Sequence, residues 1–341
     1  MTRRNAPPVR TYKITLLLVC GISFAAVGVL LLFVVRAGTT PSGAVEPESG
    51  TVSAPAAVFG DATASNNQAV RFDAAPGGNP TGFCDTYPAL PSSKPDATNT
   101  GVPNGTNLTA YTGPMTITTA GTVIDGKIIT GSLVISANNV TIKNSKIHAT
   151  GYYGITSDGP TNTKVLYSEL YALSSDTQYV GLNASNTFFC GNHVYGFENA
   201  LTIGGGNTIQ ANFIEKLDSS ASGPHYDGIE VYSGSNTAIW GNNILMTDKS
   251  GNWLADTGAI NVTPTWSNVS NIVIHGNWIG GGSNTLNLDE QGGYKLTNLT
   301  VTNNRWYGSA PKGYAAFGPI RAQNLISTFT GNVWDATNQP L

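Results

Sequence analysis

The chain has 341 residues, of which only 11% are charged, and its formal net charge is −3. This weak charge excludes the broad electrostatic attraction that a nucleic acid or an anionic membrane surface would require, so we expect no nucleic-acid partner. Forty glycines, with abundant Asn, Thr and Ser, supply turns and β-branched strand residues and leave little for exposed helices, which argues against a mainly helical protein.

The first 35 residues predict a membrane anchor. Residues 1–13 carry four basic residues and no acid, and residues 14–35 are twenty-two uncharged residues. A run of this length spans a bilayer as a helix, with its basic flank in the cytoplasm and the rest of the chain exported. The alternative is a cleaved signal peptide, for which Ser42-Gly43-Ala44 is a passable cleavage site. We therefore expect a single-pass cell-membrane protein with its main domain outside, or a secreted protein if the segment is cleaved.

Residues 36–80 are rich in Ala, Pro, Gly, Ser and Thr without periodicity, which predicts a disordered linker. Cys84 and Cys190 are the only cysteines after the membrane segment. Outside the cytosol this pair either forms a disulfide or remains as two buried thiols, and the sequence leaves both open. No Cys or His spacing suggests zinc.

A recurring asparagine predicts the fold of residues 81–341. Its copies follow one another at intervals of 23, 24, 21, 29, 35 and 27 residues, and a second polar column stands six residues after most of them. Each repeat has one strand before the Asn and a longer strand after it, and the short connections force successive coils to stack in parallel. This pattern predicts a parallel β-helix, a solenoid of about 8–10 coils, in which the asparagines are turn scaffold. The first column is Asn139, Asn162, Asn186, Asn207, Asn236, Asn271 and Asn298.

Polar residues and long loops predict a groove along one side of this solenoid. In the strand before the Asn, the outward column contains Glu230 as its only acid; its members are Thr156, Asn183, Thr202, Glu230, Asn261 and Asn287. The connections lengthen at 215–227 and 245–258 before this strand and at 263–270 and 289–297 after it. Insertions in solenoids map to a binding face, so these loops are expected to form two walls around the column.

The candidate site residues gather around Glu230. His225 and Asp227 precede it at the entry of the same strand, although an Asp-Gly pair can also be a simple turn. Asp289 lies on the same face, and two coils of about 4.8 Å put it roughly 10 Å from Glu230. The other catalytic candidates are Lys249 and Lys295. Candidates for substrate binding are Tyr226, Asn261, Asn287, Trp253, Trp266 and Arg321; the two tryptophans either stack on sugar rings or cover loop edges.

The stretch GVPNGTNLTAYTGPMTITTAGTVIDGKIITGSLVISANNVTIKNSKI, with HYDGIEV, DTGAINV and IHGNWIGGGSNTLNL, resembles a group of exported right-handed parallel β-helix proteins common in actinobacteria. They belong to the pectin lyase-like superfamily, whose members are mostly polysaccharide lyases and glycoside hydrolases. The resemblance implies a right-handed all-β solenoid and an extracellular polysaccharide or cell-wall glycan as partner. The polygalacturonase motifs are absent and the pectate lyase acids are reduced to Glu230, so neither mechanism transfers residue by residue.

Two classes of function remain open. As an enzyme the chain would be a polysaccharide lyase, slightly favoured on superfamily grounds, or an inverting glycoside hydrolase. A lyase would use Lys249, Lys295 or His225 as base, with a Ca²⁺ ion held by Asp227, Glu230 and Asp289. A hydrolase would use Glu230 and Asp289 as acid and base. The alternative class is a non-catalytic glycan-binding or cell-wall-associated structural protein.

Overall fold

The computed structural model describes residues 56–60, 68–72, 82–85, 90–176, 179–220 and 223–341. The chain divides into two units, Met1–Asp73 and Ala74–Leu341, which are described separately. In the first unit, β1 (Ala56–Gly60) and β2 (Gln68–Phe72) pair antiparallel, with Val58 opposite Val70. This hairpin lies inside the segment predicted as an irregular linker.

The predicted cytoplasmic tail and membrane segment, residues 1–35, lie outside the described residues. In the part of the chain that the structure describes, no helix is long and apolar enough to cross a membrane.

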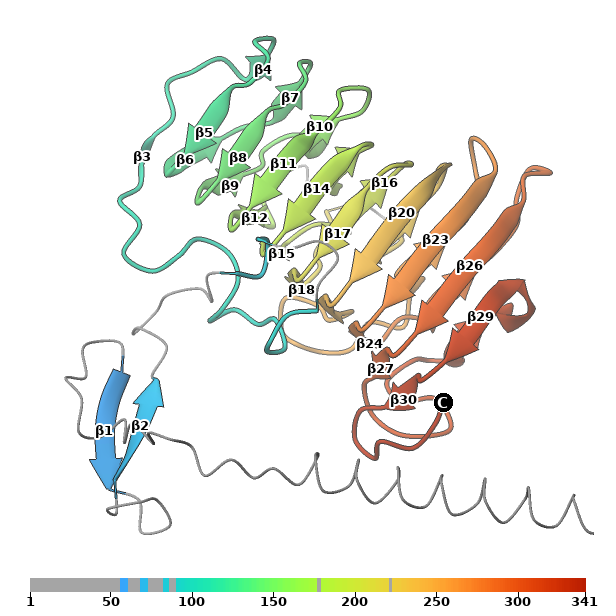
Figure 1. Cartoon of the computed structure of the whole chain (residues 1–341). Helices are drawn as coiled ribbons and strands as arrows, with labels where there is room; N and C mark the ends of the chain where they lie inside the picture. Colours follow the sequence, from blue (N-terminus) through green and yellow to red (C-terminus); the bar gives the residue numbers. More distant parts are fainter. Residues whose placement is uncertain (1–55, 61–67, 73–81, 86–89, 177–178, 221–222) are drawn as a thin grey trace, which may run out of the picture. The chain divides into compact units, whose positions relative to one another are not determined.

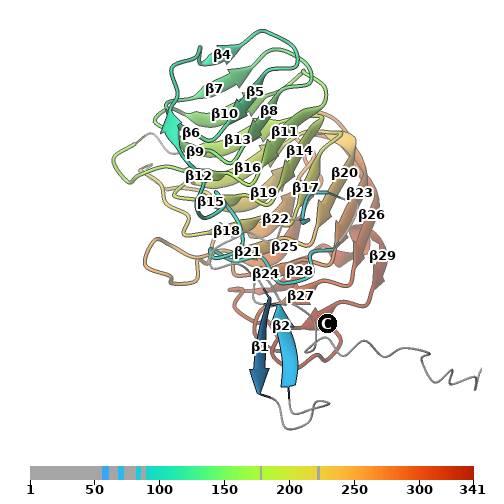
Figure 2. The same cartoon turned by 60° about the vertical axis from the view of Figure 1, so that its left-hand side comes forward.

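The second unit is a stack of coils with three parallel sheets (Figures 1 and 2). The first sheet has nine strands: β4 (Thr116–Ile117), β7 (Leu133–Ile135), β10 (Tyr153–Ser157), β13 (Val180–Ala184), β16 (Asn199–Ile203), β19 (Asp227–Val231), β22 (Gly258–Val262), β25 (Asn284–Leu288) and β28 (Gly318–Arg321). The second sheet has nine: β5 (Val123–Asp125), β8 (Thr141–Lys143), β11 (Thr163–Leu166), β14 (Thr187–Cys190), β17 (Thr208–Gln210), β20 (Gly234–Trp240), β23 (Val269–His275), β26 (Leu296–Thr302) and β29 (Ile326–Thr330).

The third sheet has ten strands: β3 (Thr109–Ala110), β6 (Lys127–Thr130), β9 (Lys146–His148), β12 (Glu169–Tyr171), β15 (His193–Tyr195), β18 (Phe213–Glu215), β21 (Asn243–Leu245), β24 (Trp278–Gly280), β27 (Arg305–Trp306) and β30 (Val333–Trp334). A short 3₁₀ helix, η3 (Gln323–Leu325), precedes β29. Each strand pairs with its equivalent in the next coil, so the architecture fits a right-handed parallel β-helix and the predicted all-β solenoid is confirmed.

Alternate residues of the strands point inward and form one continuous apolar core through the stack. The inward positions predicted from the alternation are all buried: Val140, Ile142, Ile147, Leu170, Val194, Ile214, Ile239, Ile244, Ile272, Ile274, Ile279, Leu299, Val301, Trp306 and Trp334.

The first asparagine column occupies left-handed turns, as predicted for scaffold. Six of its members have φ between 52° and 63°: Asn139, Asn162, Asn186, Asn236, Asn271 and Asn298. The seventh was predicted at Asn207, and that register is wrong by one residue. Gly206 has the left-handed φ of 73°, and Asn207 is buried beside it. Glycine adopts this conformation without strain. Gly206 therefore holds the position of the first column, and the second column follows it after the usual six residues, at Asn212.

The second column is a ladder of fully buried side chains. Each oxygen accepts the backbone N–H of the residue one coil earlier, and the asparagine amides also bond one another. For example, Asn277 Oδ1 accepts from both the backbone N and Nδ2 of Asn242 at 2.9 Å. The ladder comprises Ser145, Ser168, Asn192, Asn212, Asn242, Asn277, Asn304 and Asn332.

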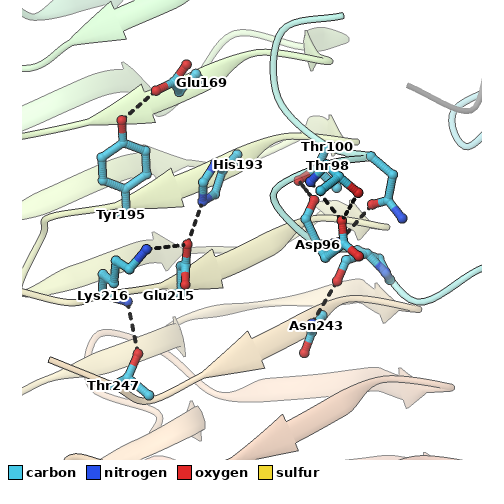
Figure 3. Close-up of polar contacts among 12 residues, drawn as sticks. Asp96, Thr98, Thr100, Glu169, His193, Tyr195, Glu215, Lys216, Asn243 and Thr247 are labelled. Atoms are coloured by element: carbon cyan, nitrogen blue, oxygen red, sulfur yellow. Dashed lines mark hydrogen bonds and ion pairs between the residues drawn. The ribbon is translucent and has the colours of Figure 1, made fainter. Parts of the chain in front are cut away.

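Cys84 and Cys190 form a disulfide with their Cα atoms 5.8 Å apart, which decides the alternative left open by the sequence. The segment that follows Cys84 lies against the coils. The N–H of Gly101 donates to the carbonyl of Gly191 at 2.9 Å, and Asn243 Nδ2 donates to the carbonyl of Pro95 at 2.7 Å (Figure 3). These contacts tie the start of the domain to the outer face of the third sheet.

Candidate functional site

The outward column of the first sheet follows the predicted register. Thr156, Asn183, Thr202, Glu230, Asn261 and Asn287 are paired one after another across β10, β13, β16, β19, β22 and β25, and Arg321 of β28 is the next member. Figure 2 shows these strands in sequence along the stack. The column therefore places Glu230 and Arg321 on one face of one sheet, three coils apart.

A cavity of about 310 Å³ opens at Glu230. Its lining residues are Tyr153, Asn183, Thr202, Glu230, Tyr232, Thr265 and Trp266. Trp266 comes from the predicted wall loop 263–270 and is 71% exposed. Thr202 Oγ1 donates to Glu230 Oε2 at 3.3 Å, and the hydroxyl of Tyr232 donates to Asn183 Oδ1 at 3.3 Å. The cavity thus combines one carboxyl group, small polar groups and three aromatic rings.

Burial raises the pKa values of two side chains that line this cavity, Glu230 of β19 and Tyr232 directly after it. Burial raises the pKa of the Glu230 carboxyl above its ordinary 4.5, against the hydrogen bond from Thr202. Burial also raises the pKa of Tyr232 to about 12, so its hydroxyl remains protonated at neutral pH. A carboxyl group with a raised pKa inside a cleft has the property that a general acid requires.

Asp227 is sealed beneath this face rather than open to it. Only 3% of the residue is exposed, and its Oδ1 has no hydrogen-bond partner. Burial raises the pKa of its carboxyl well above the usual range; the charges of Glu230 and Asp256 add to the rise, and a hydrogen bond with Asn261 opposes it. The next residue must be glycine, because a Cβ on Gly228 would lie 2.4 Å from the carbonyl oxygen of Ala259.

Side-chain amides connect Asp227 to the next coils of the column. Asn261 hydrogen-bonds to Asp227, and its Oδ1 accepts from Thr263 Oγ1 at 2.7 Å and from Asn287 Nδ2 at 3.1 Å. Both asparagines are almost fully buried. This part of the outward column, the polar strip, is therefore held by hydrogen bonds among amide and hydroxyl groups, and Asn287 carries it to the next opening.

A second cavity, of about 400 Å³, opens at Asn287 and Arg321. It is lined by His225, Asp256, Thr257, Ser283, Asn284, Asn287, Phe317 and Arg321. His225 Nδ1 lies 4.0 Å from Asp256 Oδ1, and Arg321 Nη2 lies 3.0 Å from Asp289 Oδ2. The imidazole of His225 and the guanidinium of Arg321, which both line this opening, thus each have a carboxylate beside them.

The predicted cluster around Glu230 is divided between these places. Glu230 lines the first cavity, His225 lines the second, and Asp227 is sealed between the coils. Among the described residues, no group of three or more His, Cys, Asp or Glu side chains is arranged to hold a metal ion, so Asp227, Glu230 and Asp289 do not form the expected Ca²⁺ set. The reason is geometric: Asp289 projects toward Arg321, two coils beyond Glu230.

The two candidate lysines lie in ion pairs with carboxylates of other residues. Lys249 Nζ is 3.3 Å from Asp218 Oδ2, and Lys295 Nζ is 2.7 Å from Glu290 Oε2. Neither lysine lines the cavity at Glu230. The long loops bring them to carboxylates of their own or neighbouring coils, which sequence position alone does not reveal.

The aromatic candidates also separate. Trp266 lines the first cavity, whereas Trp253 stacks on Tyr314 with ring centroids 4.4 Å apart, so a protein ring occupies its face. Tyr226 is partly buried and packs against the core. The sequence analysis missed Tyr153, Tyr232 and Phe317 as lining residues. Tyr232 had a usable signal, since it stands two positions after Glu230 and therefore on the same face.

A third opening, of about 360 Å³, lies between the segment 97–108 and Lys146, Glu169 and His193 of the third sheet. Its charged groups bond one another. Glu169 contacts Lys146 Nζ at 2.6 Å. It also contacts the hydroxyl of Tyr195, and His193 Nε2 lies 3.2 Å from Glu215 (Figure 3). These pairs lower the pKa values of Glu169 and Glu215 against burial, which indicates structural ion pairs.

No protein-family model matches this sequence, and no curated protein matches it either. Among solved structures, the chain is similar to one described as "Crystal structure of Agl-KA catalytic domain", with a TM-score of 0.42 and 15% sequence identity over 63% of this chain. The similarity spans 47% of that chain, about half of its length. A likeness this distant says nothing about the activity of the present protein.

Proposed function

We propose that this chain is an exported, carbohydrate-active β-helix protein of the pectin lyase-like superfamily that hydrolyses an uncharged extracellular polysaccharide. One observation carries the proposal: Glu230, a carboxyl group whose pKa burial raises, lines a cavity together with the exposed ring of Trp266. Aromatic rings beside hydroxyl and amide groups suit the apolar faces and hydroxyls of sugars.

Export is supported by two independent features. The uncharged segment 14–35 with its basic flank predicts translocation of everything that follows. The disulfide between Cys84 and Cys190 fits an oxidising compartment outside the cytosol.

The charges around the groove favour hydrolysis over lysis. A lyase must neutralise the carboxylate of a uronate residue, and a free cation or a metal ion would serve. Here Lys249, Lys295 and Arg321 each lie within 3.3 Å of a carboxylate of the protein. The lining of the first cavity, as the structure describes it, also contains no cationic side chain to pair with a uronate, so an uncharged sugar is the better fit.

In this proposal protonated Glu230 gives its proton to the glycosidic oxygen as the bond to the anomeric carbon breaks. A water molecule forms the new bond to that carbon and gives its proton to a second carboxylate. Asp289 is the proposed base, since Arg321 holds it on the same face two coils further on. The estimate of roughly 10 Å for two coils is close to the upper end of the inverting range of about 6.5–9.5 Å.

The proposal is tested by incubating the full-length protein with a panel of neutral and uronate-containing polysaccharides. We expect new reducing ends from a neutral polysaccharide, without the ultraviolet absorbance of an unsaturated lyase product. Glu230→Gln should lower kcat by roughly 10²–10⁴-fold while the thermal unfolding midpoint stays close to that of the wild type. The matched control is Glu215→Gln, since the Glu215 side chain is also largely buried but lies on the third sheet, paired with His193.

The same panel separates the alternative, a protein that binds glycan without cleaving it. That alternative has one observation in its favour, because Asp227, the other acid of β19, is sealed from the cavity. Retention on a polysaccharide without any released product would support binding alone. Unsaturated product, or a Glu230→Gln protein as active as the wild type, would overturn the hydrolytic proposal.

A further inference from the structure

An aromatic side chain stands nearly free beside the second cavity. Phe317 is 81% exposed, yet its backbone N–H donates to the carbonyl of Ser283 at 2.9 Å. The neighbouring N–H, of Ala316, donates to the carbonyl of Gly282 at 2.9 Å. The chain is thus fixed to the coil below while the ring remains in solvent. A ring held in this way at the edge of a polar cavity suits stacking against a sugar ring.

The second cavity is lined by polar side chains that can hydrogen-bond to a ligand. Arg321 contacts Asp289 through Nη2, and a guanidinium has five N–H donors, so most of them remain for a ligand. His225 lies beside Asp256, and Asn284 and Asn287 add amide groups. Paired charges and amides match the hydroxyl groups of a neutral sugar better than the charge of a uronate or a phosphate.

The two cavities are aligned by the register of the first sheet. Glu230, Asn261, Asn287 and Arg321 occupy the same position in four consecutive strands. At about 4.8 Å per coil, Arg321 lies roughly 14 Å from Glu230 along the stack, which is longer than a disaccharide. The amides of Asn261 and Asn287 fill the interval between the cavities and are bonded to each other at 3.1 Å.

We infer that the cavity at Phe317 and Arg321 is a second sugar-binding subsite, and that the ligand is a linear, uncharged polysaccharide lying along the axis of the β-helix. The inference rests on the proposed function and deepens it, because it gives the direction of the bound chain and a minimum length greater than a disaccharide. The ring of Phe317 stacks on one sugar, and the remaining donors of Arg321 with the amide of Asn284 bind its hydroxyl groups.

The test is the dependence of affinity on chain length. The full-length protein is titrated calorimetrically with cello-, malto-, xylo- and manno-oligosaccharides, from disaccharide to hexasaccharide. We expect the wild type to bind the longer members of one series more tightly than the disaccharide. Phe317→Ala should weaken the binding of the long members by roughly three- to tenfold and leave the affinity for the disaccharide unchanged. Phe317→Tyr, which keeps an aromatic ring, should bind the long members as tightly as the wild type does. The control is Tyr314→Ala, which removes a half-exposed ring of the same loop that stacks on Trp253 outside the cavity.

The possible failures are distinguishable. If Phe317→Ala binds long and short oligosaccharides as the wild type does, the second subsite is refuted and the proposed function stands. If the disaccharide loses as much affinity as the hexasaccharide, Phe317 acts on the first cavity and the inference is likewise refuted. If the wild type binds none of the four series at any length, both the subsite and the neutral-polysaccharide proposal fail.

Discussion

Replacing Asn277 by alanine tests whether the buried ladder holds the coils together. The side chain of Asn277 is fully buried. Its Oδ1 accepts from the backbone N and from Nδ2 of Asn242, and its Nδ2 donates to the carbonyl of Ile239 and to Asn304 Oδ1, all at 2.9 Å. Asn277 therefore makes hydrogen bonds to the coils on both sides of its own.

The expected loss follows from these bonds. Four hydrogen bonds at about 1 kcal/mol each give a destabilisation of about 4 kcal/mol, and the backbone N–H of Asn242 is left buried without its acceptor. A loss of this size is a large fraction of the roughly 5–15 kcal/mol that stabilises a typical domain. The measurement is the free energy of unfolding from urea titration followed by circular dichroism, with the slope compared between variants.

The matched control is Asn271→Gly in the other asparagine column. Asn271 also bonds the equivalent residues of both neighbouring coils, at 3.0 and 2.7 Å, but its side chain is exposed and its φ of 56° is readily adopted by glycine. Water replaces these bonds, so we expect a change of less than about 1 kcal/mol. If Asn277→Ala cost no more than Asn271→Gly, the buried ladder would contribute nothing beyond the exposed one, and the reasoning would be refuted.

Two predictions concern pH. Because burial raises the pKa of Glu230 above 4.5 and the protonated form is the proposed acid, the alkaline limb of kcat/KM for a hydrolysed polysaccharide should lie above pH 4.5; an alkaline limb at or below that value would contradict this role. The pKa of Asp227 is raised in the folded protein, so its contribution to stability is present below its unfolded pKa and is lost as pH rises through the folded pKa. Asp227→Asn should therefore flatten the decline in the free energy of unfolding toward neutral pH. The same decline with pH in the variant and the wild type, measured by urea titration at several pH values, would contradict this prediction.

The coil architecture could be predicted because its causes are local and repeated. A period of two places Val140 and Ile142 inward, and each coil repeats the same choice, so one consistent register explains the whole stack. The outward column from Thr156 to Asn287 follows for the same reason. The prediction from the repeat pattern fails at Asn207. The neighbouring glycine, Gly206, adopts the left-handed turn in its place, and only the backbone angles show which of the two residues does so.

The contents of the groove were less predictable, because they depend on contacts between loops of different coils. From the sequence, Lys249 and Trp253 are expected in a loop that forms a wall of the groove. In the structure, Lys249 forms an ion pair with Asp218, and Trp253 stacks on Tyr314. Phe317 lies outside the repeat pattern, so no periodicity marks it. The direction of a loop side chain is set by its partners. Asp218 lies 31 residues before Lys249 in the sequence, and Tyr314 lies 61 residues after Trp253.

The nature of the polar strip bears on what it can bind. Asp227 is buried with its pKa well above the usual range, and it bonds to Asn261, which bonds to Asn287. Between the two cavities, the strip thus consists of amide and hydroxyl groups that are bonded to one another and to the buried carboxyl of Asp227. It lies where the asparagine intervals stretch to 29, 35 and 27 residues. The same stretched coils supply Trp266, and the next connection supplies Phe317, so the exposed rings and the polar groups of the two cavities favour sugars under the proposed function.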